Sequence, residues 1–335
     1  MKKPKAKQLP SGSWFVRVRV DGKDIGVTKP TEKEAVAAAV ALKAGIIEAS
    51  KNPKKKTVKA AVTDYIENRR NVLSPSTIRG YTKIRDLRFT SMMNKDIHSI
   101  TQDQWQKAVN AEAKLVSAKT LLNSWRFVSS VIHEETGNRL NIRLPQVVPA
   151  DRPWLTPEQI STFVKLIKGD PIEIPALLAL SSLRRSELIN LRWKDVDLEK
   201  SCLYVNGAAV FDENGQLVRK KETKNKTSRR TVPILPPLRD ALEQIEPKGE
   251  YLVTWHPNSI MCRINRICKE AGLPEVGLHG LRHSFASLAY HLNIPEKAVM
   301  EMGGWADNQT MRKIYTHISK KDVSDHANAI SKFFE

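Results

Sequence analysis

Residues 176–192, ALLALSSLRRSELINLR, form an apolar run that ends in a cluster of charge. The run predicts a buried helix, which we extend over residues 172–192. Arg184 and Arg185 follow the apolar stretch Ala176–Leu180, and arginine is costly to bury unless an anionic group meets it. Glu187 lies three residues after Arg184, a spacing at which it can orient the guanidinium. An Arg–Glu pair on the protein surface is the alternative interpretation.

The sequence on either side of this run predicts a mainly helical domain with a small antiparallel β-sheet. Strands are expected at residues 202–210 and 216–223, joined by the turn residues Asp212–Gly215, and at residues 230–234. Further segments with helical periodicity are residues 157–168, 236–245, 258–271, 279–292, 295–302 and 308–318. Residues 154–335 are therefore expected to form an α+β domain.

Residues 57–140 predict an all-α domain, and residues 1–50 a smaller mixed one. In the first, four helices are expected to begin at Thr57, Ser74, Asp103 and Lys119. In the second, residues 12–28 alternate like a β-hairpin with its turn at Asp21-Gly22, and a helix follows over residues 35–49. The basic residues 50–56 and the proline-containing residues 141–153 are expected to be linkers.

Positive charge is concentrated near the N-terminus. The 335 residues include 55 Lys and Arg against 36 Asp and Glu, a formal charge of +19, and residues 1–60 hold 15 Lys and Arg against 5 Asp and Glu. Such charge favours a polyanionic partner, because neutralising each phosphate releases counterions. A solvated basic tail would have the same composition. The residues expected to contact nucleic acid are Arg17, Arg19, Lys23, Lys54, Lys55 and Lys56.

Composition also excludes several classes of protein. The longest apolar run, Ala35–Leu42, has eight residues, whereas a membrane-spanning helix needs about 20. The basic N-terminus precedes no apolar stretch, so we expect no secretory signal and no membrane partner. The three cysteines fit neither a disulfide framework nor a CxxC pair, which indicates a reducing, cytoplasmic setting. No metal-binding motif is present, and we expect no metal.

His279 and Arg282 form a second candidate cluster. They stand three residues apart on the helix expected over residues 279–292, away from an apolar face that includes Leu281 and Phe285. This spacing presents a titratable imidazole and a fixed cation to a common point. A solvated helix end is the alternative interpretation.

Three further side chains could carry chemistry. Lys224 lies between two expected strands, where a lysine at a hairpin tip can reach into a cleft, although most loop lysines are solvated. Trp305 follows Gly303-Gly304, and Tyr315, ten residues later, flanks an apolar stripe. A tyrosine in such a place is commonly a core aromatic with an exposed hydroxyl.

In this order, Arg-x-x-Glu, a lysine between strands, His-x-x-Arg, Gly-Trp and a late tyrosine resemble the tyrosine recombinase family, in particular its phage and mobile-element integrases. The resemblance is specific over about the last 180 residues and looser before them. It implies a multidomain protein: an arm-type DNA-binding domain at residues 1–50, a helical core-binding (SAM-like) domain at 57–140 and a catalytic domain at 154–335.

The resemblance also implies roles for individual residues. Arg184 and Arg282 match the two arginines that clamp the scissile phosphate, and Tyr315 matches the nucleophile. Lys224 matches the lysine of the strand turn, and His279 matches the first histidine of the catalytic set.

Three positions qualify the match. Trp305 stands where the family has His or Trp, and it would support the site by packing and one N–H donor. Glu187 matches the acidic residue that follows the first arginine by three. Ser182 replaces a glycine that is frequent before the motif's leucine, and we expect this change to alter the turn rather than the chemistry.

The implied activity is metal-independent, cofactor-free cutting and rejoining of DNA through a 3′-phosphotyrosine, for integration and excision of a mobile element. Ionising the tyrosine at pH 7 costs about 4 kcal/mol, which Arg184 and Arg282 would offset. We expect His279 to take the tyrosine proton and Lys224 to protonate the leaving 5′-oxygen, but position alone leaves the two assignments open.

The implied partners are double-stranded attachment-site DNA and further copies of the chain in a homotetramer on that DNA. An excision factor and a host DNA-bending protein are further candidate partners, and the location would be the nucleoid in the cytoplasm of a bacterial host. Residues 319–335 contain an apolar face that we expect to dock on a neighbouring protomer.

Three other functions compete. A DNA-binding regulator would use the same basic surfaces without chemistry, leaving Arg184, Arg282 and Tyr315 as unrelated surface residues. A type IB topoisomerase-like enzyme would share the covalent step but only relax DNA. A metal-dependent nuclease would need ligands that the sequence does not offer.

Overall fold

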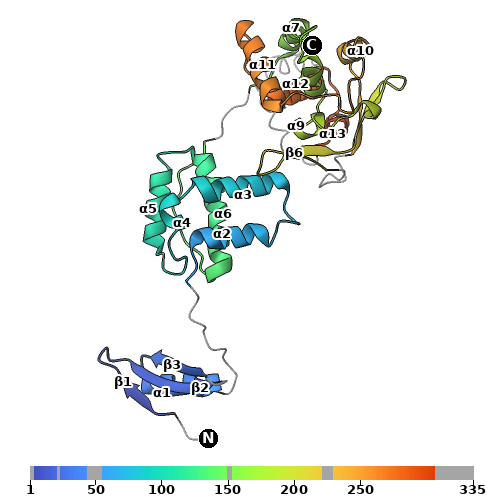
Figure 1. Cartoon of the computed structure of the whole chain (residues 1–335). Coiled ribbons are helices and arrows are strands. Elements are labelled where there is room, and N and C mark those ends of the chain that lie inside the picture. Colours follow the sequence, from blue (N-terminus) through green and yellow to red (C-terminus); the bar gives the residue numbers. More distant parts are fainter. Residues whose placement is uncertain (1–3, 21–22, 44–54, 149–152, 221–228, 306–335) are drawn as a thin grey trace, which may run out of the picture. The chain divides into compact units, whose positions relative to one another are not determined.

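The computed structural model describes residues 4–20, 23–43, 55–148, 153–220 and 229–305. Figure 1 shows its helices and strands along the chain. Lys54, Lys224 and Tyr315, together with the helix expected at residues 308–318 and the C-terminal residues 319–335, lie outside these ranges. Within them, no helix combines the length and the hydropathy that crossing a membrane requires.

The first segment is a three-stranded antiparallel sheet with a helix on one face. The sheet has the order β1 (Ala6–Gln8), β2 (Trp14–Val20), β3 (Lys23–Lys29), and α1 (Glu32–Lys43) packs against it. The alternation within β2 buries Val16 and Val18 against α1 and exposes Arg17 and Arg19, so the predicted hairpin is confirmed. The pattern did not predict β1, whose three residues are too few to show a period.

The next elements are all helical: α2 (Val58–Glu67), α3 (Pro75–Leu87), α4 (Thr90–Met93), α5 (Gln102–Glu112) and α6 (Ala118–Thr136). The four expected helices are confirmed, and the single turn α4 is additional. Phe89, Trp105 and Trp125 form an aromatic core, with edge-on ring contacts whose centroids lie 5.6–6.1 Å apart. The core accounts for the presence of Trp105 and Trp125 in helices whose exposed faces are polar, because both side chains are buried in it.

The C-terminal elements combine helices with two small sheets. Strands β4 (Val196–Asp197), β5 (Cys202–Val205) and β8 (Arg230–Pro233) form one antiparallel sheet, and β6 (Ala208–Phe211) pairs with β7 (Leu217–Lys220) in another. The helices are α7 (Pro157–Leu166), α8 (Glu173–Leu180), α9 (Arg185–Leu188), α10 (Pro236–Glu243), α11 (Pro257–Glu270), α12 (Gly277–His291) and α13 (Glu296–Gly303). A 3-10 turn at Trp193–Asp195 precedes β4.

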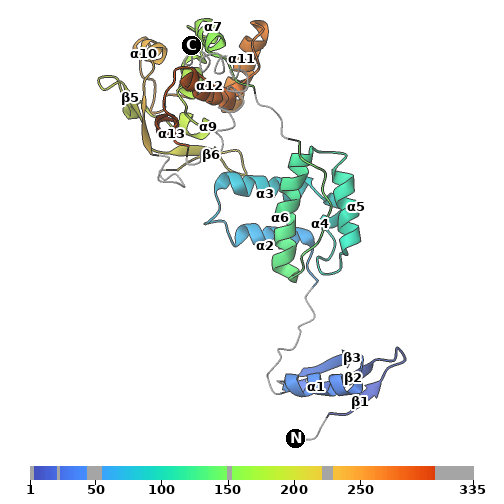
Figure 2. The same cartoon turned by 180° about the vertical axis from the view of Figure 1, so that it is seen from behind.

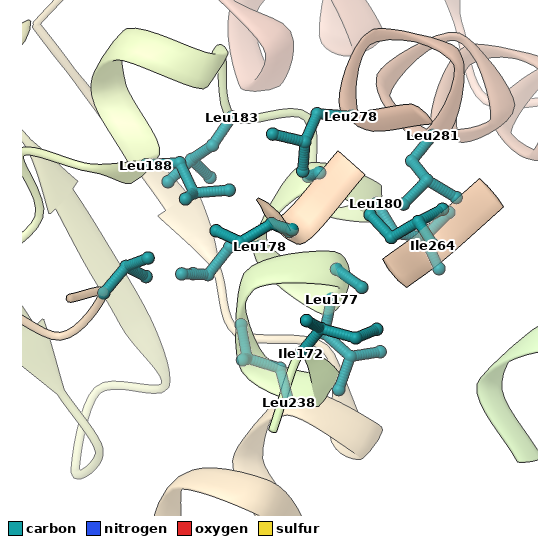
Figure 3. Close-up of a cluster of buried hydrophobic side chains, with 14 of the residues drawn as sticks. Ile172, Leu177, Leu178, Leu180, Leu183, Leu188, Leu238, Ile264, Leu278 and Leu281 are labelled. Atoms are coloured by element: carbon teal, nitrogen blue, oxygen red, sulfur yellow. The ribbon is translucent and has the colours of Figure 1, made fainter. Parts of the chain in front are cut away.

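The core of this part is built around α8, which is buried from Pro175 to Leu180. Figure 3 shows leucines of α8 surrounded by side chains from α10, α11 and α12. Helix α12 lies beside α7 and α11 (Figure 2) and also packs on α8. The residues that follow α8, Ser181 and Ser182, therefore lie close to α12 and α13.

The expectation of one helix over residues 172–192 was wrong. Helix α8 ends at Leu180, where Ser182 takes the left-handed conformation with φ 74°. The Leu183 amide donates to the Leu178 carbonyl and the Ser182 amide to the Ala179 carbonyl, the pair of hydrogen bonds of a Schellman motif. Apolar periodicity continues through this break and conceals it.

The expectation of one strand over residues 202–210 was also wrong. The chain pairs with β8 up to Val205 and then, past Asn206-Gly207, enters the second sheet as β6. Val205 and Ala209 are both buried, on separate sheets. The sequence showed only a continuous apolar stretch, because which partner strand each half would meet depends on distant residues.

Candidate active site

Arg184 is fixed at the first turn of α9 by Glu187. The backbone N–H of Arg184 donates to Glu187 Oε2 (2.8 Å), and its Nη1 donates to Oε1 (2.6 Å). Its Nη2 donates to the carbonyl of Gly304. The Arg184 side chain keeps 36% of its surface exposed, whereas the Glu187 side chain keeps 2%. The two residues are therefore not a surface pair, and the guanidinium is held rigidly while remaining open to a ligand.

Arg282 is buried inside the same region, with 2% of its surface exposed. Its Nη1 donates to the Ser182 carbonyl and its Nη2 to the Gly303 carbonyl (2.7 Å). Burial, and then the positive charges of Arg184 and Arg230, lower the pKa of Arg282 to about 9. The alternative interpretation, a solvated helix end, is therefore wrong for Arg282, because α12 is buried around most of its circumference here.

The loop after α13 closes the site on one side. Gly304 ends the helix with φ 63°, and the Trp305 ring follows with its centroid 4.2 Å from the Arg282 guanidinium carbon. The Phe285 ring also stacks on the Trp305 ring, with the two ring centroids 6.4 Å apart. A Cβ on Gly303 would lie 1.7 Å from this ring, so a glycine is required for the tryptophan to pack there.

Arg230 is a member of this cluster that the sequence analysis missed. It begins β8, and its Nη2 donates to Glu187 Oε2 (3.0 Å) while its Nε donates to the Met302 carbonyl (2.9 Å). One signal was available: in a strand, alternate residues share a face, and Arg230 stands two before the buried Val232. An arginine on the buried side of a strand indicates an internal anionic partner.

Charge within this cluster is unbalanced. Among the described residues, the guanidiniums of Arg184, Arg230 and Arg282 gather around a single carboxylate, that of Glu187. Burial opposes ionisation of Glu187, but hydrogen bonds and charge interactions with Arg230 and Arg184 together hold its pKa below the usual value, so the carboxylate is ionised. The cluster therefore carries an excess of two positive charges, next to the partly exposed Arg184. Such a site favours binding an anion with several oxygens.

His279 lies on α12 one turn before Arg282, but its side chain is exposed. Its ring packs edge to face against His283, with centroids 4.5 Å apart. His279 is exposed while Arg282 is buried, and the common point that we expected the two side chains to face stays a prediction.

The basic residues expected to contact nucleic acid are in different environments. Arg17 and Arg19 project from the exposed face of β2, and Lys55 is exposed. Lys23 pairs with Val20 at the last position of the β2–β3 ladder, where β3 begins. Lys56, in contrast, binds Glu135 (2.7 Å) and Asp64 (2.9 Å), so two carboxylates already neutralise the charge that we expected it to offer.

Residues 153–322, just over half of the chain, match the phage integrase family. The XerC-like tyrosine recombinase of Caldanaerobacter subterraneus subsp. tengcongensis is 29% identical over 211 residues, which are 53% of each chain. The integrase of Staphylococcus phage L54a is 25% identical over 62% of this chain and 64% of its own. The chain thus spans about half to two thirds of the length of these relatives.

Solved structures show the same fold at lower identity. The Tn1549 transposon integrase in complex with transposon right end DNA has a TM-score of 0.66 at 18% identity, covering 82% of this chain and 100% of that one. A lambda integrase tetramer bound to a Holliday junction has a TM-score of 0.55 at 15% identity, covering 91% and 96%. With the family match over its C-terminal half, this chain belongs to the phage integrase family.

Proposed function

We propose that the protein is a site-specific DNA recombinase that cuts and rejoins DNA through a tyrosine. The observation that carries this proposal is the excess of positive charge around Glu187, set beside the partly exposed Arg184. A phosphodiester is the anion that a recombinase must bind and stabilise as charge builds on its oxygens. Arg184 and Arg282 would hold it, and Trp305 would support Arg282 by packing.

The excess positive charge suits a reaction in which negative charge develops on the nucleophile and the phosphate. The Tyr315 hydroxyl oxygen would attack the scissile phosphorus, the bond from phosphorus to the 5′-oxygen would break, and a 3′-phosphotyrosine and a free 5′-hydroxyl would result. His279 would receive the tyrosine proton and Lys224 would protonate the departing oxygen. The 5′-hydroxyl of a second strand then reverses the step. The cationic site lowers the cost of the tyrosinate and of the transition state alike.

DNA would also be bound away from the catalytic residues. Arg17 and Arg19 share the exposed face of β2, opposite the face that packs on α1, and fit an arm-type domain over residues 1–50. Lys23, Lys54 and Lys55 would add contacts to phosphates. Lys56 is better assigned to the fold of the helical segment, because its charge is neutralised there.

The wider organisation follows the structural relatives. A helical core-binding domain at residues 57–140 would join the arm-type domain to the catalytic domain at 154–335, and four copies would assemble on attachment-site DNA in the bacterial cytoplasm. The lambda integrase relative is a tetramer on a Holliday junction, which supports this assembly. Docking of residues 319–335 on a neighbouring copy, an excision factor and a host DNA-bending protein complete the proposal.

Covalent trapping tests the proposal. A nicked duplex with the DNA that flanks this gene in its element is mixed with the protein, denatured and examined for a protein–DNA band. The expected result is a band that Tyr315→Phe abolishes. DNA binding without a band would favour the regulator, and relaxation of supercoiled DNA without exchange between paired sites would favour the topoisomerase. The buried position of Arg282 argues against the regulator, which leaves the arginines as surface residues.

A further inference from the structure

Arg230 connects three separate parts of the catalytic region. From the start of β8 its Nη2 donates to Glu187 Oε2 at 3.0 Å and approaches the Ser182 carbonyl at 3.4 Å. Its Nε donates to the Met302 carbonyl at 2.9 Å. The same side chain therefore holds the turn before α9, the carboxylate within α9 and the end of α13.

Arg230 and Arg184 share Glu187, but only one of them is open to a ligand. The side chain of Arg184 keeps 36% of its surface exposed, whereas that of Arg230 keeps 6%. The Arg230 Nη1 is buried and has no hydrogen-bond partner among the described residues. A Cβ on Gly304 would lie 3.0 Å from that nitrogen, so the guanidinium packs directly against the loop that leads to Trp305. A DNA phosphate could therefore reach Arg184, whereas Arg230 is covered by protein.

The contacts of Arg230 coincide with the acceptors of the two arginines that we propose bind phosphate. Glu187 fixes Arg184, and the Ser182 carbonyl also accepts from Arg282. Met302 precedes Gly303 and Gly304, whose carbonyls accept from Arg282 and Arg184. Moving Arg230 would displace the supports of both guanidiniums at once.

We infer that Arg230 is a positioning residue for DNA cleavage, acting through Glu187 and the Met302 carbonyl to fix Arg184 and Arg282 in their working geometry. This inference rests on the proposed function. It assigns Arg230 a role in the rate of the chemical step and none in holding DNA, because Arg230 donates to Glu187 and to the Met302 carbonyl and, unlike Arg184, is covered by protein.

Single-turnover cleavage of the nicked duplex at saturating protein separates this role from a merely structural one. Arg230→Gln is expected to lower the rate constant by about 100-fold, the effect of misplacing a catalytic group by about 1 Å, with the dissociation constant for DNA unchanged. A purely structural role predicts the wild-type rate constant with a smaller reacting fraction. Arg239→Gln is the matched control, because Arg239 also pairs with a glutamate, Glu243 on α10, and contacts none of the cluster.

Two further variants test the route of the effect. If Arg230 acts through Glu187, the double variant Glu187→Gln/Arg230→Gln should cleave no more slowly than the slower single variant, whereas independent roles would multiply the two losses. Arg230→Lys keeps the charge, can reach fewer of the acceptors, and should cleave at an intermediate rate. It also serves if the glutamine variant does not fold.

The outcomes distinguish this inference from the proposed function. A wild-type covalent band with an unchanged rate constant for Arg230→Gln, or with only a reduced reacting fraction, overturns the role of Arg230 alone. Multiplying losses in the double variant overturn the route through Glu187. Absence of a covalent band from the wild-type protein overturns the proposed function, and this inference falls with it.

Discussion

Lys56 and Arg282 are basic residues whose side chains are half-buried and buried, respectively, but the charges around them differ. One ammonium, that of Lys56, meets two carboxylates, from Asp64 and Glu135. In the cluster that contains Arg282, three guanidiniums meet the one carboxylate of Glu187 among the described residues. The first cluster is complete without a ligand and serves the fold. The second retains positive charge that folding alone would not favour, and the DNA phosphate that we propose as its ligand would supply the missing anion.

The largest effect is expected from removing a charge of the unbalanced cluster. Arg282→Gln should slow single-turnover cleavage by about 10³-fold, the scale measured when one preorganised donor to a developing oxyanion is lost. Lys56→Met should cleave at the wild-type rate. Equal losses in the two variants would remove the distinction between the clusters.

A related measurement needs no DNA. Sulfate should raise the thermal midpoint of the wild-type protein and of Lys56→Met more than chloride does at equal ionic strength, because an anion that binds only the folded state stabilises it. Arg282→Gln should lose this additional shift. An additional shift that is the same in all three proteins would indicate a general salt effect and no anion site.

Glu187→Gln is expected to have the next largest effect, on stability. Leaving three guanidiniums, two of them buried, without their carboxylate should lower the free energy of unfolding by about 3 kcal/mol in urea denaturation. The pKa of Glu187 is lower in the folded state than its ordinary value of 4.5. Its contribution is therefore full above pH 4.5 and is lost as pH falls through the folded value. The variant should show a shallower loss of stability below pH 4.5, and a limb as steep as the wild type's would contradict this.

A smaller effect is expected in the balanced cluster. Lys56→Met should lower the free energy of unfolding by about 1 kcal/mol, because the ion pairs are partly exposed and screened by water. Urea denaturation of Glu135→Gln provides the complementary variant. A loss of several kcal/mol in either protein would mean that this cluster is as constrained as the one around Glu187.

Substitutions at Ser182 should give the smallest change in the free energy of unfolding. Its φ of 74° costs a non-glycine residue about 1 kcal/mol, while its Oγ donates to the Met302 carbonyl at 3.2 Å. Ser182→Gly removes the strain but loses the same hydrogen bond, so it should change the free energy of unfolding by less than about 1 kcal/mol. Ser182→Ala keeps the strain, loses the hydrogen bond and should lower it. The opposite ranking of the two variants in urea denaturation would contradict this account.

The helices of this chain were largely predictable because their signals are local. Capping residues and apolar periodicity mark α5, α6, α7 and α11 within a few positions of their observed bounds. The break at Ser182 was not visible, since serine seldom takes the left-handed conformation and the apolar periodicity continues through the turn. The division of residues 202–210 between two sheets depends likewise on strands far along the chain.

The sequence by itself determined the residue types, the order of the motifs and the spacing of Arg184 from Glu187, because these are covalent or lie within one helical turn. Tertiary structure decided which charges meet. Arg184, Arg230 and Arg282 come from α9, β8 and α12, and the packing of α8 against α12 brings them to one carboxylate. The electrostatic energy of such a cluster depends on distance and burial, and neither quantity exists until the chain has folded.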